Sequence, residues 1–370
     1  MSERLAISMW DFSWLLRRDG AEAEYADWDR ALDELAERGY NCVRIDAFPH
    51  LISQTAERFV IRPQRPRFMW GNHASVEVGP RRGLVEFVRK ARERGVRVGL
   101  SSWFVDDDTH QRRSIRAPED LSRSWRSVLD LLAGEGLLDA VAWVDLCNEF
   151  PLGIWVPAIY ERLFGKAWPN VLPLFRRWSD VERKAVASYL AEAIDPLRSV
   201  YPQVRFTFSF QGFGASNVQA LTPEALDCVE VHAWFVESPR LLLRSGQFLA
   251  LLELPAGVAV HRTIGPWAFR SGRRRWLSEL ARRLDAWKAW AGGRPIFTSE
   301  GWASIYYEGA ASDDAEWKWI KSASSEAIPL ALDRGWAGLC TSNFSQPHFP
   351  GLWRDVGWHR EMTRLIRHGS

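Results

Sequence analysis

Two carboxyl-bearing residues each lie at the end of a short apolar run. Glu149 follows Ala140-Val-Ala-Trp-Val-Asp-Leu-Cys-Asn148 and precedes Phe150-Pro151, and Glu300 ends the run Pro295-Ile-Phe-Thr-Ser. Such runs are typical of strands that are buried on both faces of a parallel sheet. Proline cannot donate a ladder hydrogen bond, so we expect the first strand to stop at Pro151. Burial raises the pKa of a carboxyl group, as a proton donor at neutral pH requires, although Glu149 could also merely cap the following segment.

Six further strands are predicted along the chain, and helical patterns separate them. The eight strands are 5–10, 40–46, 96–103, 140–151, 204–210, 228–234, 295–300 and 336–342, and the main helical patterns cover 25–38, 84–94, 121–132, 180–199, 239–254, 276–291, 315–333 and 358–367. Buried strands that alternate with helices indicate parallel βαβ units. Eight units predict an α/β fold, a single (β/α)8 TIM barrel over residues 1–370, and no Gly-rich dinucleotide motif follows the first strand.

Long segments follow strands 2, 4 and 6 of this predicted barrel. They begin at Ala47, at Pro151 and just after Trp234. Barrel enzymes keep their sites at the C-terminal end of the strands, where these segments would lie. We therefore expect long βα loops after strands 2, 4 and 6 to form the walls of a cleft.

Polar side chains at the strand ends would converge in that cleft. They are Arg44 and Asp46 on strand 2, Asn148 and Glu149 on strand 4, His232 on strand 6 and Glu300 on strand 7. Two carboxyl groups that flank one bond are the apparatus of glycoside hydrolysis, in which one donates a proton and the other stays ionised. Arg44 is a suitable cation to keep one of them charged.

Four motifs resemble those of cellulase-type, retaining glycoside hydrolases of clan A, and the similarity is greatest to the family 5 group and its cellulase-like relatives. The motifs span strands 2 to 7 and are Tyr40-Asn-Cys-Val-Arg44, Leu146-Cys-Asn-Glu-Phe-Pro151, His232-Ala-Trp234 and Ile296-Phe-Thr-Ser-Glu300. The resemblance implies that Glu149 is the general acid/base and Glu300 the nucleophile that forms a covalent glycosyl-enzyme. It also implies that Asn148 binds the sugar 2-hydroxyl, Arg44 positions Glu300 and His232 lines the sugar subsite.

The sequence departs from the family 5 pattern on three strands. Ser101-Ser102-Trp103 stands where a histidine is usual, His232-Ala233-Trp234 replaces His-x-Tyr, and Ser342-Asn343-Phe344 replaces a tryptophan platform. Trp353 is a candidate substitute for that platform. With 21 tryptophans in the chain, several are expected to stack against sugar faces. The further candidate contacts with the carbohydrate are Asp46, His50, Trp103, Trp234 and Trp302.

The sequence thus predicts a hydrolase that cleaves a β-linked glycoside or short oligosaccharide, acts from a chain end and needs no cofactor or metal. A transglycosylase could use the same two carboxyl groups. A non-catalytic sugar-binding barrel would not need both Glu149 and Glu300. A metal-dependent hydrolase using His50, His110 and His232 would need two histidines spaced His-x-His, a pattern that does not occur. Asp106-Asp-Asp108 is interpreted as an acidic surface loop and 270–275 as a solvated basic loop.

Bulk composition argues against several other classes of protein. The net charge is +2, and hydrophobic and charged residues make up 46% and 25%, which are globular values that favour neither nucleic acid nor a membrane surface as a partner. No secretory leader and no apolar span of about 18 residues is present, which predicts a cytoplasmic protein. The four cysteines are expected to be reduced and to point mostly into the barrel. The sequence leaves the oligomeric state undetermined.

Overall fold

Eight parallel strands form a closed ring, as predicted. The computed structural model describes residues 3–19, 23–63, 71–166, 176–252, 254, 256–305 and 314–369. The ring contains β1 (Leu5–Asp11), β2 (Cys42–Asp46), β5 (Arg97–Ser101), β6 (Val141–Asp145), β7 (Phe206–Thr207) with β8 (Ser209–Gln211), β9 (Val229–Trp234), β10 (Ile296–Thr298) with β11 (Gly301–Trp302), and β12 (Gly338–Cys340). β7 pairs with β6 and β8 pairs with β9, so the split fifth strand joins the two halves of the ring.

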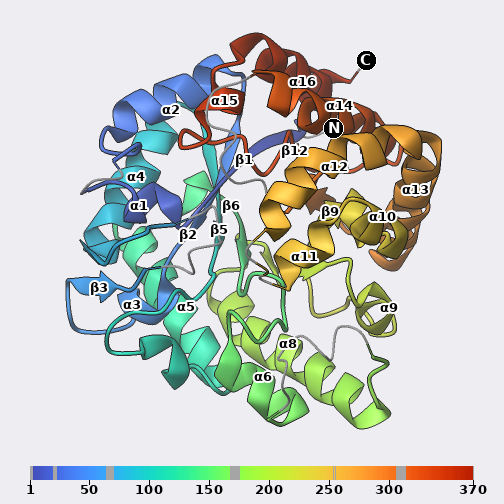
Figure 1. Ribbon diagram of the computed structural model, residues 1–370. Coiled ribbons are helices and arrows are strands. Elements are labelled where there is room, and N and C mark those ends of the chain that lie inside the picture. Colours follow the sequence, from blue (N-terminus) through green and yellow to red (C-terminus); the bar gives the residue numbers. More distant parts are fainter. Residues whose placement is uncertain are drawn as a thin grey trace.

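Helices surround the strands (Figure 1), and their buried apolar residues pack with those of the strands in one large cluster. The longer ones are α2 (Trp28–Glu37), α4 (Pro80–Glu93), α5 (Pro118–Gly134), α8 (Asp180–Val200), α13 (Arg273–Trp290), α14 (Asp314–Leu332) and α16 (Val356–His368). Helix α2 illustrates the cause: Asp27 caps its first turn by accepting from Arg30 N, and its buried residues recur at helical spacing. α8 begins with a capping box between Ser179 and Glu182.

A small apolar cluster fills the lower part of the barrel. It consists of Ile7, Cys42, Ala142, Trp143, Cys228 and Phe297, packed against Leu5. Gly99 makes room for Trp143, because a Cβ at position 99 would lie 2.3 Å from that ring. Cys42 and Cys228 therefore point inward as predicted. Cys147 does not, because it belongs to the larger cluster that packs the strands against the helices.

The connections after strands 2, 4 and 6 carry extra elements. After β2 come α3 (Pro49–Ile52) and an antiparallel pair, β3 (Phe59–Ile61) with β4 (Val76–Val78), and after β6 comes α6 (Pro157–Phe164). The connection after β9 holds η3 (Phe235–Glu237), α10 (Pro239–Arg244), α11 (Gln247–Leu251) and α12 (Gly257–Ser271) before α13. Shorter elements are α1 (Ser13–Leu16), η1 (Gln111–Ser114), η2 (Leu138–Ala140), α9 (Ala215–Val218) and α15 (Pro350–Trp353).

Three details of the sequence prediction are wrong. β6 ends at Asp145, six residues before Pro151, because the backbone turns there. Residues 270–275 lie at the junction of helices α12 and α13, so they are not a loop. In the acidic loop 106–108, Asp108 is exposed as predicted, but Asp107 is fully buried and its carboxyl group accepts from the backbone of Thr109 and Gln111. Within the part of the chain that the structure describes, each helix is too short or too polar to cross a bilayer.

Candidate active site

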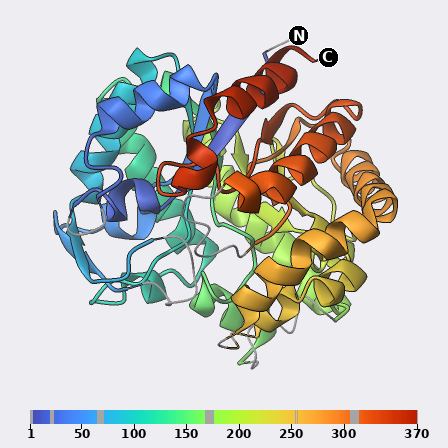
Figure 2. The same cartoon turned by 45° about the horizontal axis from the view of Figure 1, so that its top comes forward.

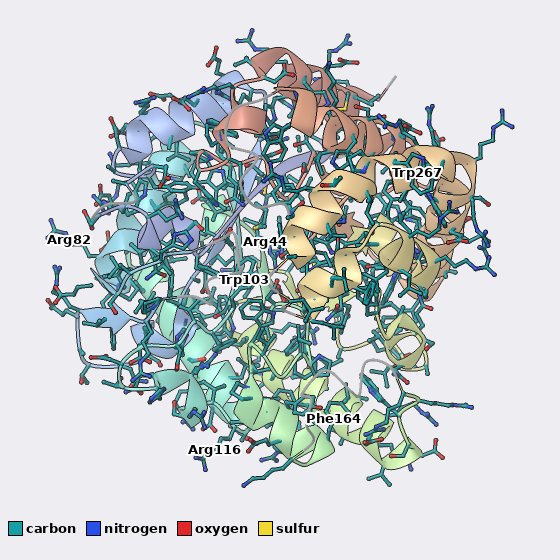
Figure 3. All side chains as sticks on the ribbon, in the orientation of Figure 1. Arg44, Arg82, Trp103, Arg116, Phe164 and Trp267 are labelled. Atoms are coloured by element: carbon teal, nitrogen blue, oxygen red, sulfur yellow. The ribbon has the colours of Figure 1, made fainter. Side chains whose placement is uncertain are left out.

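Arg44 is the centre of a buried polar network inside the upper barrel. It projects from β2, is fully buried, and donates to Glu300 Oε1 at 2.8 Å. Its Nη2 donates to Asp145 Oδ2 at 2.9 Å and to Asn148 Oδ1 at 2.6 Å. Figure 3 places Arg44 near the middle of the molecule, close to Trp103, whose ring lies 4.4 Å from the guanidinium carbon. A planar cation with several donors can thus hold residues from two other strands in fixed positions.

Glu149, His232 and Glu300 meet beside this arginine. His232 Nδ1 lies 3.0 Å from Glu149 Oε1 and 3.6 Å from Glu300 Oε2. One oxygen of each carboxyl group and one ring nitrogen lie within 4.8 Å of one another. The side chains of Glu149 and Glu300 are 16% and 7% exposed, whereas His232 is fully enclosed. The two carboxyl groups are therefore close together, and both reach solvent.

The backbone around Glu149 is bent and held by the fifth strand. Glu149 has φ +49°, in the left-handed region that a non-glycine residue rarely adopts. Ser209 fixes the bend, because its Oγ accepts from Glu149 N at 2.9 Å and its carbonyl oxygen accepts from Phe150 N at 2.9 Å. Asn148 N donates to Ser102 O on the other side. The bend allows the Glu149 side chain to turn into the barrel mouth after the strand has ended.

Burial and neighbouring charges together raise the pKa values of His232 and Glu300. Burial opposes the charge of His232, but Glu300 and contacts with Glu149 and Glu230 outweigh it and raise the pKa to about 10. His232 is therefore an imidazolium at neutral pH. Burial raises the pKa of Glu300, and the cations of His232 and Arg44 oppose that rise while Glu149 adds to it.

Asp145 and Glu230 are buried partners that the sequence analysis missed. Glu230 Oε1 lies 3.4 Å from Arg44 Nε and accepts from Ser299 Oγ, and its Oε2 accepts from Trp143 Nε1 at 2.8 Å. Burial opposes ionisation of Glu230, yet Arg44 and His232 lower its pKa. Burial and the charge of Glu230 raise the pKa of Asp145. The available signal was alternation, because Glu230 precedes His232 by two residues and so shares its face of β9.

Asp46 and His50 lie near the strand ends but use their polar atoms on the protein backbone. Asp46 is fully buried and accepts from Phe48 N at 2.7 Å and from Trp103 N at 2.9 Å. Burial raises its pKa to about 7. His50 is also fully buried, and its Nε2 contacts Val105 O at 3.0 Å. Both residues thus hold loops in place, while His50 Nδ1 has no hydrogen-bond partner, and their contact with a sugar stays a prediction.

The tryptophans predicted to contact sugar do not all lie beside the buried polar network. Trp103 packs against Arg44, and Trp302 donates to Cys340 O at 3.0 Å from a fully buried position after β10. Trp234, at the end of β9, is 1% exposed. Trp353 lies on α15, where it donates to Glu34 and packs on Arg38 of α2, so it is not brought to the carboxyl pair. Trp267 is exposed on α12, at the periphery in Figure 3.

Among the described residues, Glu149, His232 and Glu300 form the single group of three or more His, Cys, Asp or Glu side chains whose atoms could meet on a metal ion. With both carboxyl groups beside a protonated His232, the group also fits proton transfer and charge stabilisation.

An eight-stranded barrel with paired glutamates at the ends of strands 4 and 7 defines a cellulase-type barrel. The chain belongs to the cellulase-like family: the family described as sugar-binding cellulase-like matches residues 7–367. A protein from Parabacteroides distasonis, provisionally assigned as a glycoside hydrolase, is 32% identical, with a TM-score of 0.85 over 99% of this chain and 94% of its own.

More distant solved structures share the fold. The family 5 glycoside hydrolase PbGH5A from Prevotella bryantii is 14% identical with a TM-score of 0.53, covering 96% of this chain and 95% of its own. GH5_18 from Streptomyces cattleya, solved with GlcNAc, is 14% identical with a TM-score of 0.54, covering 100% and 82%. No curated protein matches the chain in sequence. The family resemblance and the barrel expected from the sequence are thus confirmed.

Proposed function

We propose that the protein is a retaining glycoside hydrolase that cleaves a β-linked glycoside or short oligosaccharide by double displacement. The observation that carries the proposal is the short distance between Glu149 and Glu300. One carboxyl oxygen of Glu149 lies within 4.8 Å of one carboxyl oxygen of Glu300. Retaining enzymes hold their carboxyl groups about 5–5.5 Å apart, whereas inverting enzymes leave about 6.5–9.5 Å for a water molecule. The short separation supports retention.

The surroundings support different roles for the two glutamates. Glu300 contacts Arg44 at 2.8 Å and lies 3.6 Å from the imidazolium of His232, so two cations oppose the rise that burial causes in its pKa and support a role as nucleophile. Of these two cations, Glu149 contacts only His232, and its side chain is more exposed than that of Glu300. That position suits a group that exchanges protons with a leaving group and then with water.

The reaction follows in two balanced steps. A Glu300 oxygen attacks the anomeric carbon while the bond to the leaving oxygen breaks and Glu149 gives that oxygen its proton. Glu149 then removes a proton from water, the water oxygen attacks the anomeric carbon, and the bond to Glu300 breaks. Asn148 can still donate its amide hydrogens to the sugar, because its oxygen already accepts from Arg44.

Action at a chain end is the part of the proposal that rests on the loops. The inserted segments after β2, β6 and β9 follow the same ends of the strands that bear Arg44, Glu149 and His232. Segments of this length favour enclosing a terminal sugar over an open groove for a polymer. Transfer to a sugar acceptor would use the same glycosyl-enzyme and is a second outcome of the experiment below.

Aryl β-glycosides of several sugars test the proposal. Wild-type protein should release the phenol and give a first sugar product of unchanged anomeric configuration by NMR. Glu300→Ala should lose turnover, and Glu149→Ala should lose about 10²- to 10⁴-fold, less with a leaving group that needs no protonation. Asp107→Asn is the control: it changes a buried carboxyl group outside the site and should keep activity. Binding of sugar without turnover would instead identify a non-catalytic sugar-binding barrel, and an inverted product would exclude retention.

A further inference from the structure

Two buried side chains at the ends of β1 and β12 have polar atoms without partners. Asp11 is 1% exposed; its Oδ1 accepts from Ser13 N at 2.6 Å and Ser13 Oγ at 2.7 Å, whereas its Oδ2 has no hydrogen bond. Asn343 is fully buried, and both Oδ1 and Nδ2 are unpaired. An unmade hydrogen bond at a buried group is costly, so three unpaired atoms in neighbouring strands require an explanation.

Both residues lie beside Glu300. β12 pairs with β10 on one side and with β1 on the other, so Asn343 and Asp11 follow strands that succeed Glu300 around the ring. Asn343 N donates at 2.8 Å to the carbonyl oxygen of Gly301, the residue after Glu300. Burial, reinforced by the charge of Glu300, raises the pKa of Asp11 to about 7. Around the ring, β12 lies four strands and β1 three strands from β6, the strand that leads to Glu149.

The wall is held in place by its own hydrogen bonds. Gln346 Nε2 donates to Asn343 O at 2.9 Å, and Tyr25 Oη donates to Gln346 Oε1 at 3.3 Å. The Gln346 amide also lies near Asp11 and acts to lower its pKa, but Oδ2 still lacks a hydrogen bond. Asp11 has φ +41°, a backbone conformation that costs energy for a residue with a side chain. The unpaired atoms therefore belong to an ordered wall and not to a frayed loop end.

We propose that Asp11 and Asn343 form a hydroxyl-binding subsite for the sugar that becomes attached to Glu300, and that they determine which sugar is accepted. A carboxylate accepts hydrogen bonds, while an amide both donates and accepts, so together they match hydroxyl groups on neighbouring ring carbons. A site built to bind a hydroxyl group discriminates strongly against a sugar that lacks it, because its own buried polar atoms then stay unpaired. For turnover, this inference rests on the proposed function.

The experiment compares Asp11→Ala and Asn343→Ala with wild-type protein. The probes are 4-nitrophenyl β-glycosides of glucose, mannose, galactose and xylose, and monodeoxy analogues of the best of these. Each variant should lower kcat/KM for the best glycoside about 10- to 100-fold, the expected effect of one buried hydrogen bond to a charged or polar group. With the analogue that lacks the contacted hydroxyl, the variant and wild-type protein should differ little.

Asp107→Asn is the matched control, since both oxygens of that buried carboxyl group are paired within its own loop. Equal losses with all analogues, or no loss, would overturn the subsite and leave a structural role. Binding of the same glycosides to Glu300→Ala, measured by calorimetry with and without the Asp11 and Asn343 changes, separates the two proposals. If wild-type protein binds the glycosides selectively but does not turn them over, hydrolysis is refuted and the subsite is retained. If the Asp11 and Asn343 changes leave the selectivity of binding unchanged, the subsite alone is refuted.

Discussion

At the scale of single residues, the site is a balance of buried charges. Arg44 contacts Glu300, Asp145 and Glu230, so its positive charge is shared among three carboxyl groups. His232 supplies the second cation and lies between Glu149 and Glu300. Isolated buried charges are costly, but a network in which each charge has opposite neighbours keeps them in place. This arrangement explains why a histidine with no exposed surface can remain protonated at neutral pH.

The raised pKa of His232 predicts a loss of stability at alkaline pH. Its pKa is about 10 in the folded protein and about 6.5 when unfolded, so its stabilising contribution is complete below pH 6.5 and disappears as pH rises through 10. Urea unfolding between pH 7 and 9.5 should show a falling free energy, on the order of a few kcal/mol from this group. His232→Gln should flatten that slope. His50→Gln should not, because burial lowers the pKa of His50 to about 4. Equal slopes in all three proteins would contradict the assignment.

At the scale of elements, the packing of β5 against β6 supports the charged network from below. Gly99 on β5 faces Trp143 on β6, and Trp143 Nε1 holds Glu230. Gly99→Ala should cost about 1–3 kcal/mol, because the added carbon would lie 2.3 Å from the ring and must displace it. Thermal unfolding and kcat/KM should both fall. Gly134→Ala in α5 is the control: its Cβ would meet nothing within 4 Å, so Tm should hold or rise. A normal Tm for Gly99→Ala would contradict this account of the packing.

The barrel could be predicted from sequence because strands and helices alternate with recognisable periods. The ends of strands could not, and 146–150 shows why. Leu146 and Cys147 continue the apolar run, yet the backbone turns there because Ser209, 60 residues later, binds the Glu149 and Phe150 amides. The packing of Trp353 and the hydrogen bonds of Asp46 could not be predicted for a similar reason. Their partners Glu34 and Trp103 come from other elements, which a linear pattern does not contain.

At the scale of the whole molecule, the last helix closes the ring. Figure 2 shows the two ends of the chain side by side, and α16 packs against β1 while Arg367 pairs with Glu3. His359 on α16 contacts the Tyr40 hydroxyl at 2.7 Å, and Thr363 Oγ1 donates to Arg38 O at 2.8 Å. The helix therefore joins β1 to the segment that leads into β2.

Removal of residues 356–370 should consequently unfold the barrel and not merely shorten it. The deletion would expose the apolar surfaces that Met362 and Ile366 cover and leave the buried hydroxyl of Tyr40 with fewer partners. We expect an insoluble product, or a Tm lower by more than 10 °C with loss of the cooperative transition, measured by circular dichroism and calorimetry. Deletion of residues 369–370 alone should change Tm little, since it removes the capping hydrogen bond from Gly369 N to Leu365 O but leaves the apolar face of α16 intact. A soluble, cooperative 1–355 fragment would show that the ring closes through its strand pairing alone.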